Sequence, residues 1–322
     1  MAQQQEIIYG QLSKCLSETD YDFLGAKYAG KVRDNYTRGT TRFLVTSDRL
    51  SCFDVVVTTI PFKGQVLNQM AAYWFEHTSH IIPNHLMAVP DPNVMVVKLC
   101  QVLPVEVIVR AYLAGSAYRD YIDGKAISGN KIPGGLKQHE KLPELLVTPS
   151  TKAEKGQHDL PISEREILER GLLEPELWQQ IKTAALSLFR FGQEEALKRG
   201  LILADTKYEF GLADGELVLV DEIHTLDSSR YWAAESYPER FRNGESPEML
   251  DKEPTRQWLL SRGYKGEGKV PEFTDEHRVS ISQHYIDSFQ RITGLKFEPR
   301  SGGIEQLIKA NLQRYLDDTR SD

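Results

Sequence analysis

Apolar and polar residues alternate along residues 205–212, and the stretch 201–230 around them is predicted to be the central element of the fold. Three polar side chains share one face of it: Asp205, Lys207 and Glu209. Four others share the opposite face: Thr206, Tyr208, Phe210 and Leu212. A period of two residues is typical of a half-buried strand. A second strand is predicted over 217–223, after a turn that contains glycine, so the two strands form a hairpin.

The length of this turn decides whether the hairpin carries a site. A three-residue loop, 213–215, with its glycine in a β-bulge, places Lys207 opposite Asp221 and makes Glu209 the diagonal neighbour on the same face. A two-residue turn, 214–215, would instead put Glu209 and Asp221 on opposite faces. The pattern alone leaves both registers open.

In the first register, two carboxylates lie beside one lysine. Carboxylate oxygens suit Mg²⁺, and an ammonium group suits an anion such as phosphate. A solvated polar face is the alternative, and for an arbitrary hairpin it is the more common one. The apolar run 217–220 continues directly into Asp221 and Glu222. Charges at the end of a buried run favour the site.

Composition narrows the class of protein. The chain has 322 residues, 40% hydrophobic and 26% charged, which is typical of a globular protein with more than one lobe. Its formal net charge of -7 gives no general attraction for nucleic acid. Its three cysteines are far apart, which argues against a disulfide framework or a zinc site. We expect a cytoplasmic protein, without a secretory signal or a membrane span.

Residues 28–48 are predicted to form an antiparallel hairpin, with Gly30 and Lys31 at its entry. The spacing is not that of a P-loop, although a Gly-Lys loop can cover nucleotide phosphates. A plain hairpin is the alternative. The polar residues that follow, including Ser47 and Asp48, must in part serve turns.

Two apolar strands, 94–99 and 105–109, are joined by a short connector at 100–104. Its proline removes a backbone donor, so the connector could be a hinge between lobes where an adenine ring would lie. Arg110 follows, and Ser116 begins a helix, which together offer a guanidinium and a hydroxyl to an anion. An arginine paired with an acid and a serine N-cap is an equally good interpretation.

Residues 123–163 are rich in Gly, Pro and polar side chains. A loop of this length in a compact enzyme is usually functional or disordered, and we expect it to cover a substrate. His158 by itself does not indicate a catalytic base, because a lone surface histidine is more common. Amphipathic helices are predicted at 65–77, 175–199, 254–261, 274–294 and 304–316.

Motifs along nearly the whole chain resemble, in order, those of the SAICAR synthetase family of purine biosynthesis. The matching segments are YAGKVRDNY, TSDRLSCFDVV, IPFKGQVLNQ, LPVEVIVRAYLAGSAYRDY, TPSTKAEKGQHD, ADTKYEFG, VDEIHTLDSSRYW and DKEPTRQWL. Their number and order make the resemblance specific, and the length is that of the longer, yeast-like form. Cys52 and the pair Asp34-Asn35 depart from the family's usual residues.

The resemblance implies an α+β fold with an antiparallel N-terminal lobe over an α/β lobe, akin to ATP-grasp enzymes and kinases, with added C-terminal helices. Three regions are expected. They are a β-rich nucleotide-binding lobe at 1–103, an α/β lobe with the metal and ribonucleotide sites at 104–240, and a helical region at 241–322.

The resemblance also implies an ATP-dependent carbon–nitrogen ligase. It would join the carboxylate of 5-amino-1-(5-phosphoribosyl)imidazole-4-carboxylate, the carboxyaminoimidazole ribonucleotide, to the amine of L-aspartate, giving SAICAR, ADP and phosphate. ATP and Mg²⁺ are the implied cofactors. The expected partners are small-molecule substrates, with no nucleic acid and no membrane, and the expected state is a monomer or small homo-oligomer. Such chemistry needs cations and alignment rather than a covalent nucleophile.

Site roles follow from the matched motifs. The implied nucleotide-binding positions are Gly30, Lys31, Arg33, Cys100, Gln101, Val102, Leu103, Glu209 and Asp221. Glu209 and Asp221 would hold Mg²⁺, which requires the three-residue loop, because they can share a metal only from one face. The implied substrate-binding positions are Ser47, Asp48, Arg110, Ser116, Lys152, His158, Asp205, Lys207 and Arg230. Arg110, Ser116 and Arg230 would bind the 5′-phosphate, and Lys207 and Asp221 are the implied catalytic residues.

Two other functions compete with this one. An ATP-grasp-like kinase or ligase acting on another phosphorylated nucleotide would use the same arginines and serine. A non-catalytic nucleotide-binding protein could keep the same fold. The intact Lys31, Glu209 and Asp221 argue against the second, because such a protein needs no paired metal carboxylates.

Overall fold

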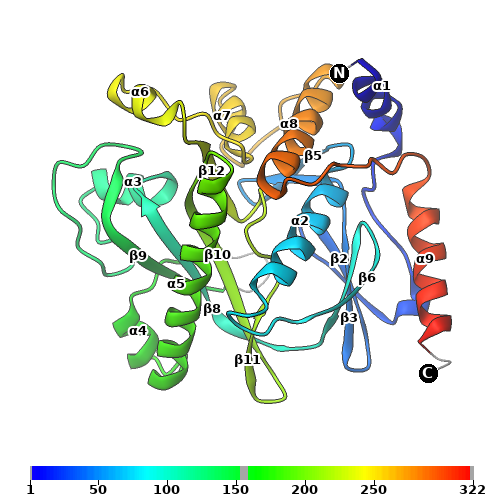
Figure 1. Cartoon of the computed structure of the whole chain (residues 1–322), viewed down its shortest axis with the longest axis horizontal. Coiled ribbons are helices and arrows are strands. Elements are labelled where there is room, and N and C mark those ends of the chain that lie inside the picture. The colour runs from blue at the N-terminus through cyan, green and yellow to red at the C-terminus, as the bar shows by residue number, and fades with distance from the viewer. Residues whose placement is uncertain (1, 153–158, 320–322) are drawn as a thin grey trace. The chain divides into compact units, whose positions relative to one another are not determined.

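The computed structural model describes residues 2–152 and 159–319 (Figure 1). Within these residues the chain forms two compact units. Unit 1 comprises Met1–Tyr73, His85–Leu99 and Asp251–Asp322, and unit 2 comprises Trp74–Asn84 and Cys100–Leu250. Residues after 250 thus cluster with the N-terminal strands, whereas the sequence suggested a separate region at 241–322. The three functional regions stay a prediction.

Unit 1 contains an antiparallel sheet with the strand order β1-β2-β3-β7-β6. Its strands are β1 (Ala26–Ala29), β2 (Arg33–Arg38), β3 (Thr41–Thr46), β6 (Leu86–Asp91) and β7 (Val94–Lys98). The β2–β3 pairing confirms the hairpin predicted over 28–48. Most residues of β3 and β7 are buried. Many of them are β-branched or aromatic, as expected for strands inside a sheet.

The rest of unit 1 is a short hairpin and a set of helices. The hairpin pairs β4 (Arg49–Cys52) with β5 (Val55–Thr59). The helices are α1 (Ala2–Gln11), η1 (Leu12–Lys14), η2 (Asp22–Leu24), α2 (Lys63–Thr78), α7 (Glu253–Ser261), α8 (Asp275–Thr293) and α9 (Ile304–Asp318). The residues of α2 from Trp74 onward cluster with unit 2. The Thr274 hydroxyl accepts the His277 N–H at the start of α8, and Gly294 ends it with a φ of 73°. These caps confirm the limits predicted for that helix.

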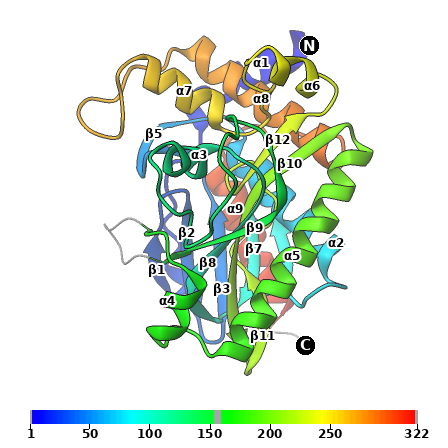
Figure 2. The ribbon, with the colours of Figure 1, turned by 90° about the vertical axis from the view of Figure 1, so that its left-hand side faces the viewer.

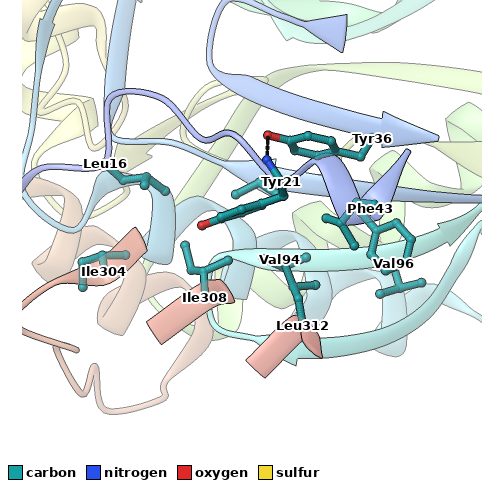
Figure 3. Packing of buried hydrophobic residues seen from close by; sticks show 11 residues of the cluster. Leu16, Tyr21, Tyr36, Phe43, Val94, Val96, Ile304, Ile308 and Leu312 are labelled. Atoms are coloured by element: carbon teal, nitrogen blue, oxygen red, sulfur yellow. Dashed lines mark hydrogen bonds between the residues drawn. The ribbon is translucent and has the colours of Figure 1, made fainter. Parts of the chain in front are cut away.

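One hydrophobic cluster of unit 1 lies between its sheet and α9. Side chains spaced by four residues on α9 point toward the buried residues of β7 and toward Tyr21 (Figure 3). They are Ile304, Ile308 and Leu312. This spacing places them on one face of the helix, so α9 belongs to the core.

Unit 2 is built around β10 (Leu201–Ala213). On one edge β10 pairs with β8 (Gln101–Tyr112), which in turn pairs with β9 (Lys141–Thr151). On the other edge it pairs first with β12 (Ser229–Ala233) and then with β11 (Glu216–Val220). All these pairings are antiparallel. Both edges of β10 are therefore paired, and its polar residues Asp205 and Glu209 are buried.

Helices complete unit 2. They are α3 (Gly115–Ile122), α4 (Glu164–Glu169), α5 (Pro175–Lys198) and α6 (Tyr237–Arg242). α5 lies alongside β10 (Figures 1 and 2), and it confirms the helix predicted over 175–199. No helix in the described ranges combines the length and the apolar character that crossing a membrane requires.

Two expectations about strands were wrong. The 123–163 region contains β9, although Pro143 and Pro149 suggested a loop. Among the strands of the described residues β9 pairs with β8 alone, with one further bridge from Ser150 to Pro161. Such an edge strand tolerates prolines because many of its outward N–H groups need no ladder partner. The predicted hinge over 100–104 is shorter, since β8 already begins at Gln101. Pro104 is accommodated where the β8–β10 register shifts.

Candidate active site

The turn between β10 and β11 has two residues, not three. Ala213 pairs with Glu216, which leaves Asp214 and Gly215 as the turn. Both have positive φ, 53° and 86°, the conformation of a type I′ turn, whose twist matches that of antiparallel strands. The predicted three-residue loop was wrong because Asp214 also adopts the left-handed conformation, which an aspartate tolerates.

Glu209 and Asp221 nevertheless both act on Lys207. In the observed register Glu209 pairs with Val220, where β11 ends. Asp221 then has a φ of 69°, so the chain has left the ladder and the alternation of faces no longer applies. The charge of Asp221 contributes to raising the pKa of Lys207. The requirement for an odd loop failed because the predicted second strand ran too far, to residue 223.

Charged side chains of unit 2 form a partly buried row across β8 and β10. Glu106 and Glu209 are Cα partners, and they are 5% and 6% exposed. The Lys207 Nζ atom donates to Glu106 Oε1 at 2.6 Å and to Glu209 Oε1 at 3.0 Å. Lys152 donates to the other oxygen of Glu209. Buried carboxylates are tolerated when they are paired in this way.

The protonation of this row follows from its contacts. Burial raises the pKa of Glu209, but the charges of Lys207 and Lys152 outweigh it and hold that pKa below its usual range. For Glu106, burial and repulsion from Glu209 outweigh Lys207 and raise the pKa to about 7. Burial lowers the pKa of Lys207, but the neighbouring carboxylates raise it by more. Glu209 and Lys207 are therefore ionised near neutral pH, and Glu106 exchanges a proton there.

Two residues further back along the same face of β10, Asp205 lies between two arginines on one rung of the sheet. It is the Cα partner of Arg110 on β8 and of Arg230 on β12. Arg110 Nη1 is 3.3 Å from Asp205 Oδ2, and Arg230 Nη1 is 2.9 Å from each Asp205 oxygen. One carboxylate between two guanidinium groups leaves a net positive charge, which suits an anion.

The start of α3 adds polar groups to this rung. Arg110 Nη2 donates to Ser116 Oγ at 3.4 Å, and its Nε donates to Thr148 Oγ1 at 2.9 Å. The N-cap of α3 is Ala114, which has no side-chain cap, so Ser116 is not the N-cap. The structure thus combines both interpretations of Arg110: it pairs with an acid and also contacts the serine.

Gly115 makes room for Arg230. It has a φ of 58°, and a Cβ atom built there would lie 2.4 Å from Arg230 Nη2. Any larger residue would be strained in this conformation and would displace the guanidinium. The glycine therefore fixes where Arg230 can lie at the start of α3.

In unit 1, Lys31 lies in the connection between β1 and β2. Its Nζ atom is 2.5 Å from Asp54 Oδ1, at the tip of the β4–β5 hairpin, and the two side chains are 56% and 51% exposed. An exposed ion pair contributes little to stability. An incoming anion can therefore compete with Asp54 for Lys31.

Ser47 and Asp48 contact the backbone of unit 1. The Ser47 hydroxyl donates to the Val32 carbonyl at 2.7 Å. The Asp48 oxygens accept the N–H groups of Leu16 at 2.7 Å and of Gly64 at 2.9 Å. Burial raises the pKa of Asp48 to about 6. The prediction that these two residues bind substrate stays a prediction.

A family model described as SAICAR synthetase matches residues 26–272. The chain belongs to the SAICAR synthetase family. The phosphoribosylaminoimidazole-succinocarboxamide synthase of Bacteroides thetaiotaomicron is 49% identical over 311 residues, which cover 94% of this chain and 99% of the relative. The corresponding synthase of Legionella pneumophila strain Paris is 45% identical over 312 residues, with 94% and 99% covered.

Solved structures of SAICAR synthetases share the fold. The SAICAR synthase of Saccharomyces cerevisiae, complexed with SAICAR, aligns with a TM-score of 0.77 at 32% identity, covering 88% of this chain and 99% of that one. A SAICAR synthetase in complex with ADP aligns with a TM-score of 0.66 at 24% identity, covering 85% and 100%. The predicted family, its ligase function and the α+β fold are confirmed.

The remaining positions implied by the SAICAR synthetase motifs lie as follows. Cys100 packs against the cluster of Ala213, Val218 and Val220. Gln101, Val102 and Leu103 open β8, and Leu103 is buried whereas Val102 is 37% exposed. Arg33 begins β2 beside Gly30. His158 lies outside the described residues, as does most of the segment predicted to cover a substrate.

Sequence reasoning missed Glu106, although a signal was present. A glutamate in the middle of the apolar run LPVEVIV needs a buried partner, and that partner is Lys207. Interpreting Glu106 as a charged residue inside a buried strand would have identified it as a site residue. Thr148, which holds Arg110, gave no such signal, because a threonine is ordinary in a strand.

Proposed function

We propose that this member of the SAICAR synthetase family joins the carboxylate of carboxyaminoimidazole ribonucleotide to the amine of L-aspartate, with ATP giving ADP and phosphate. The order of charged groups along one face of β10 carries the proposal. Asp205 with its two arginines comes first, then Lys207, then Glu209. At 3.3–3.4 Å per residue, this face spans roughly 13 Å. The ribonucleotide has its groups in the same order, a phosphate at one end and a carboxylate at the other.

The arginine rung would bind the 5′-phosphate. Arg110 and Arg230 supply the charge, and Ser116 and the first N–H groups of α3 supply further donors. Asp205 would keep the two guanidinium groups in place, because it is hydrogen-bonded to both. A phosphate handle of this kind binds the ground state and the transition state about equally.

Lys207 would lie at the carboxylate that is activated. Its ammonium is ionised and already held by Glu106 and Glu209, so it needs little reorganisation to stabilise negative charge on the transferring phosphoryl group. The attacking aspartate amine needs no covalent help from the protein. Lys152, His158, Ser47 and Asp48 remain candidates for binding substrate, either L-aspartate or the ribonucleotide.

The residues present fit a Mg²⁺ ion. Glu209 is ionised, and Asp221 lies close enough to raise the pKa of Lys207. No three potential metal ligands gather within residues 2–152 and 159–319, but Mg²⁺ needs only one or two carboxylates, with phosphate and water completing its shell. Glu209 and Asp221 would hold the ion, which would neutralise charge on the phosphates of ATP. Binding would require Lys152 to leave Glu209, and that side chain is 39% exposed.

In unit 1, the connection between β1 and β2 would contact ATP phosphates through Gly30, Lys31 and Arg33. In unit 2, Cys100 and the first residues of β8 would contact the adenine. The ADP complex of a related SAICAR synthetase supports the use of ATP. The SAICAR complex of the Saccharomyces cerevisiae enzyme supports small molecules as the partners.

A steady-state assay of ADP release tests the proposal. The purified chain is given ATP, Mg²⁺ and the carboxylated ribonucleotide, with and without L-aspartate, and products are identified by mass spectrometry. We expect ADP release to depend on L-aspartate and SAICAR to form in equal amount. Release that does not depend on L-aspartate, or an end product that carries the phosphoryl group transferred from ATP, would overturn the proposal in favour of a kinase.

A further inference from the structure

The connection that carries Lys31 accepts hydrogen bonds from the side chains of a neighbouring segment of unit 1, residues 47–49. Arg49, the first residue of β4, donates from Nε to the Lys31 carbonyl at 2.9 Å and from Nη2 to the Gly30 carbonyl at 3.1 Å. Ser47 donates to the next carbonyl, that of Val32, through its hydroxyl at 2.7 Å and its backbone N–H at 3.0 Å. Three consecutive carbonyl groups therefore face the 47–49 segment.

The guanidinium of Arg49 is itself fixed in place. Its Nη2 donates to Asp34 Oδ1 at 2.8 Å, and its Nη1 donates to the Ser17 carbonyl at 2.5 Å. Asp34 is 1% exposed, and its second oxygen accepts both the backbone N–H and the hydroxyl of Thr19, at 2.8 and 3.0 Å. A buried, fully engaged carboxylate cannot shift freely, so the arginine has one orientation.

Peptide geometry relates these carbonyl contacts to the direction of the backbone N–H groups, which can face an anion. In a trans peptide the C=O and the following N–H point in opposite directions. Holding the carbonyls of Gly30, Lys31 and Val32 toward the 47–49 segment therefore turns the next three N–H groups away from it. Backbone N–H groups aimed to one side attract phosphate, whereas carbonyls aimed there would repel it.

We propose that Arg49, assisted by Ser47, is a positioning residue that orients the Gly30–Arg33 connection for the phosphates of ATP. The proposal rests on the proposed function, in which Lys31 and its neighbours contact those phosphates. Arg49 acts from behind the connection through its carbonyls and does not touch the nucleotide. Asp34 serves as the anchor of Arg49.

Calorimetric titration of the full chain with ADP and Mg²⁺ tests this role. Arg49→Met keeps the length of the side chain but removes its donors. We expect its Kd for ADP to rise about tenfold, the loss of one to two charge-assisted hydrogen bonds. Arg49→Lys, which can restore one donor, should recover part of the affinity. The Kd for the carboxylated ribonucleotide should change by less than about twofold, because its proposed phosphate site lies on Arg110 and Arg230.

Arg278→Met is the matched control. Arg278 also lies in unit 1 and also holds backbone carbonyls, those of Thr59 and Leu12, at 2.9 and 3.2 Å. Its loss should lower the melting temperature about as much as the loss of Arg49, but it should leave the Kd for ADP unchanged. Equal effects of the two variants on ADP binding would reduce Arg49 to a structural role and overturn the proposal.

Two further variants distinguish a failure of the proposed Arg49 role from a failure of the proposed function. If Arg49→Met does not fold, Ser47→Ala removes the hydroxyl that donates to the Val32 carbonyl and accepts the Arg49 backbone N–H. This variant should weaken ADP binding in the same direction, about threefold. Unchanged ADP binding in Ser47→Ala would then count against the proposal. Lys31→Met tests the proposed function itself. If Lys31→Met binds ADP as tightly as the parent chain, the phosphate role of the connection fails; if only Lys31→Met is impaired, the role of Arg49 fails alone.

Discussion

Glu106 and Glu209 face each other as Cα partners on β8 and β10, and the Lys207 ammonium donates to both. Two buried carboxylates that share one ammonium do not ionise equally. Lys152 adds a second cation to Glu209 alone, so Glu209 keeps its charge and Glu106 becomes the group that changes protonation. This asymmetry keeps Glu209 ionised, the form that a carboxylate needs to hold a metal.

Glu106→Gln should remove a pH dependence of stability. The pKa of Glu106 is raised from 4.5 to about 7, so between these values the folded state holds a proton that the unfolded chain has released. The stabilisation is therefore present below pH 4.5 and is lost as the pH rises to about 7. The loss is at most about 3 kcal/mol. Denaturant unfolding should show the parent chain losing stability relative to Glu106→Gln across this range.

The exposed Glu144 on β9 provides the control for this experiment. Glu144→Gln should follow the parent chain at every pH, because an exposed carboxyl is surrounded by water in both states. A constant difference in free energy of unfolding between the parent chain and Glu106→Gln would contradict the raised pKa of Glu106.

Asp221→Asn should abolish most turnover without unfolding the chain. Asp221 follows the end of β11 with a left-handed φ, and losing one charged ligand at a phosphoryl-transfer site costs on the order of several kcal/mol in the transition state. Asp214→Asn, the same change at the exposed turn of the same hairpin, is the control and should keep full activity. Near-normal kcat in Asp221→Asn at saturating Mg²⁺ would rule out Asp221 as a metal ligand.

Gly115→Ala should raise the KM for the ribonucleotide more than it lowers kcat. The added Cβ would meet Arg230 Nη2 at 2.4 Å, and displacing a phosphate handle weakens binding of ground and transition states alike. Gly124→Ala is a matched control: its φ of 70° imposes similar backbone strain, about 1–2 kcal/mol, but nothing lies within 4 Å of the new carbon. If both variants change KM equally, the effect comes from strain and not from Arg230.

Sequence patterns predicted the elements whose signals are local. The helix from Thr274 to Gly294 was found because a cap at each end and an apolar stripe agree. β9 was missed because Pro143 and Pro149 argue against a strand, and only its place at the edge of the sheet, which sequence does not reveal, makes them acceptable. β12 was missed because a strand of five residues carries little periodicity.

In the candidate site, too, local sequence patterns predict the place of some residues and not of others. Asp205, Lys207 and Glu209 could be placed on one face from alternation alone, and their contacts agree with this. Alternation could not place Asp221, because its position depends on where β11 stops. Nor could it place Arg49, because three of its four acceptors are backbone carbonyls, those of Ser17, Gly30 and Lys31. Contacts to the backbone leave no signature in side-chain patterns.

Gly192→Ala should destabilise the chain and disturb the segment that carries Asp221. A Cβ atom on Gly192 of α5 would lie 2.4 Å from Cε1 of His224. His224 is fully buried with a φ of 53°, and its Nε2 is 2.7 Å from the Tyr208 hydroxyl. Burial lowers the pKa of His224 to about 3. The ring is therefore neutral near neutral pH, and no charge draws it out toward solvent.

Overpacking of this kind costs about 1–3 kcal/mol, which denaturant unfolding would measure. Gly10→Ala in α1 is the control, because nothing lies within 4 Å of its new carbon and alanine favours a helix by about 1 kcal/mol. His224 follows Asp221 by three residues, so a displaced ring should also lower kcat at temperatures where Gly192→Ala remains folded. Full activity in a destabilised Gly192→Ala would show that His224 supports the fold but does not position Asp221.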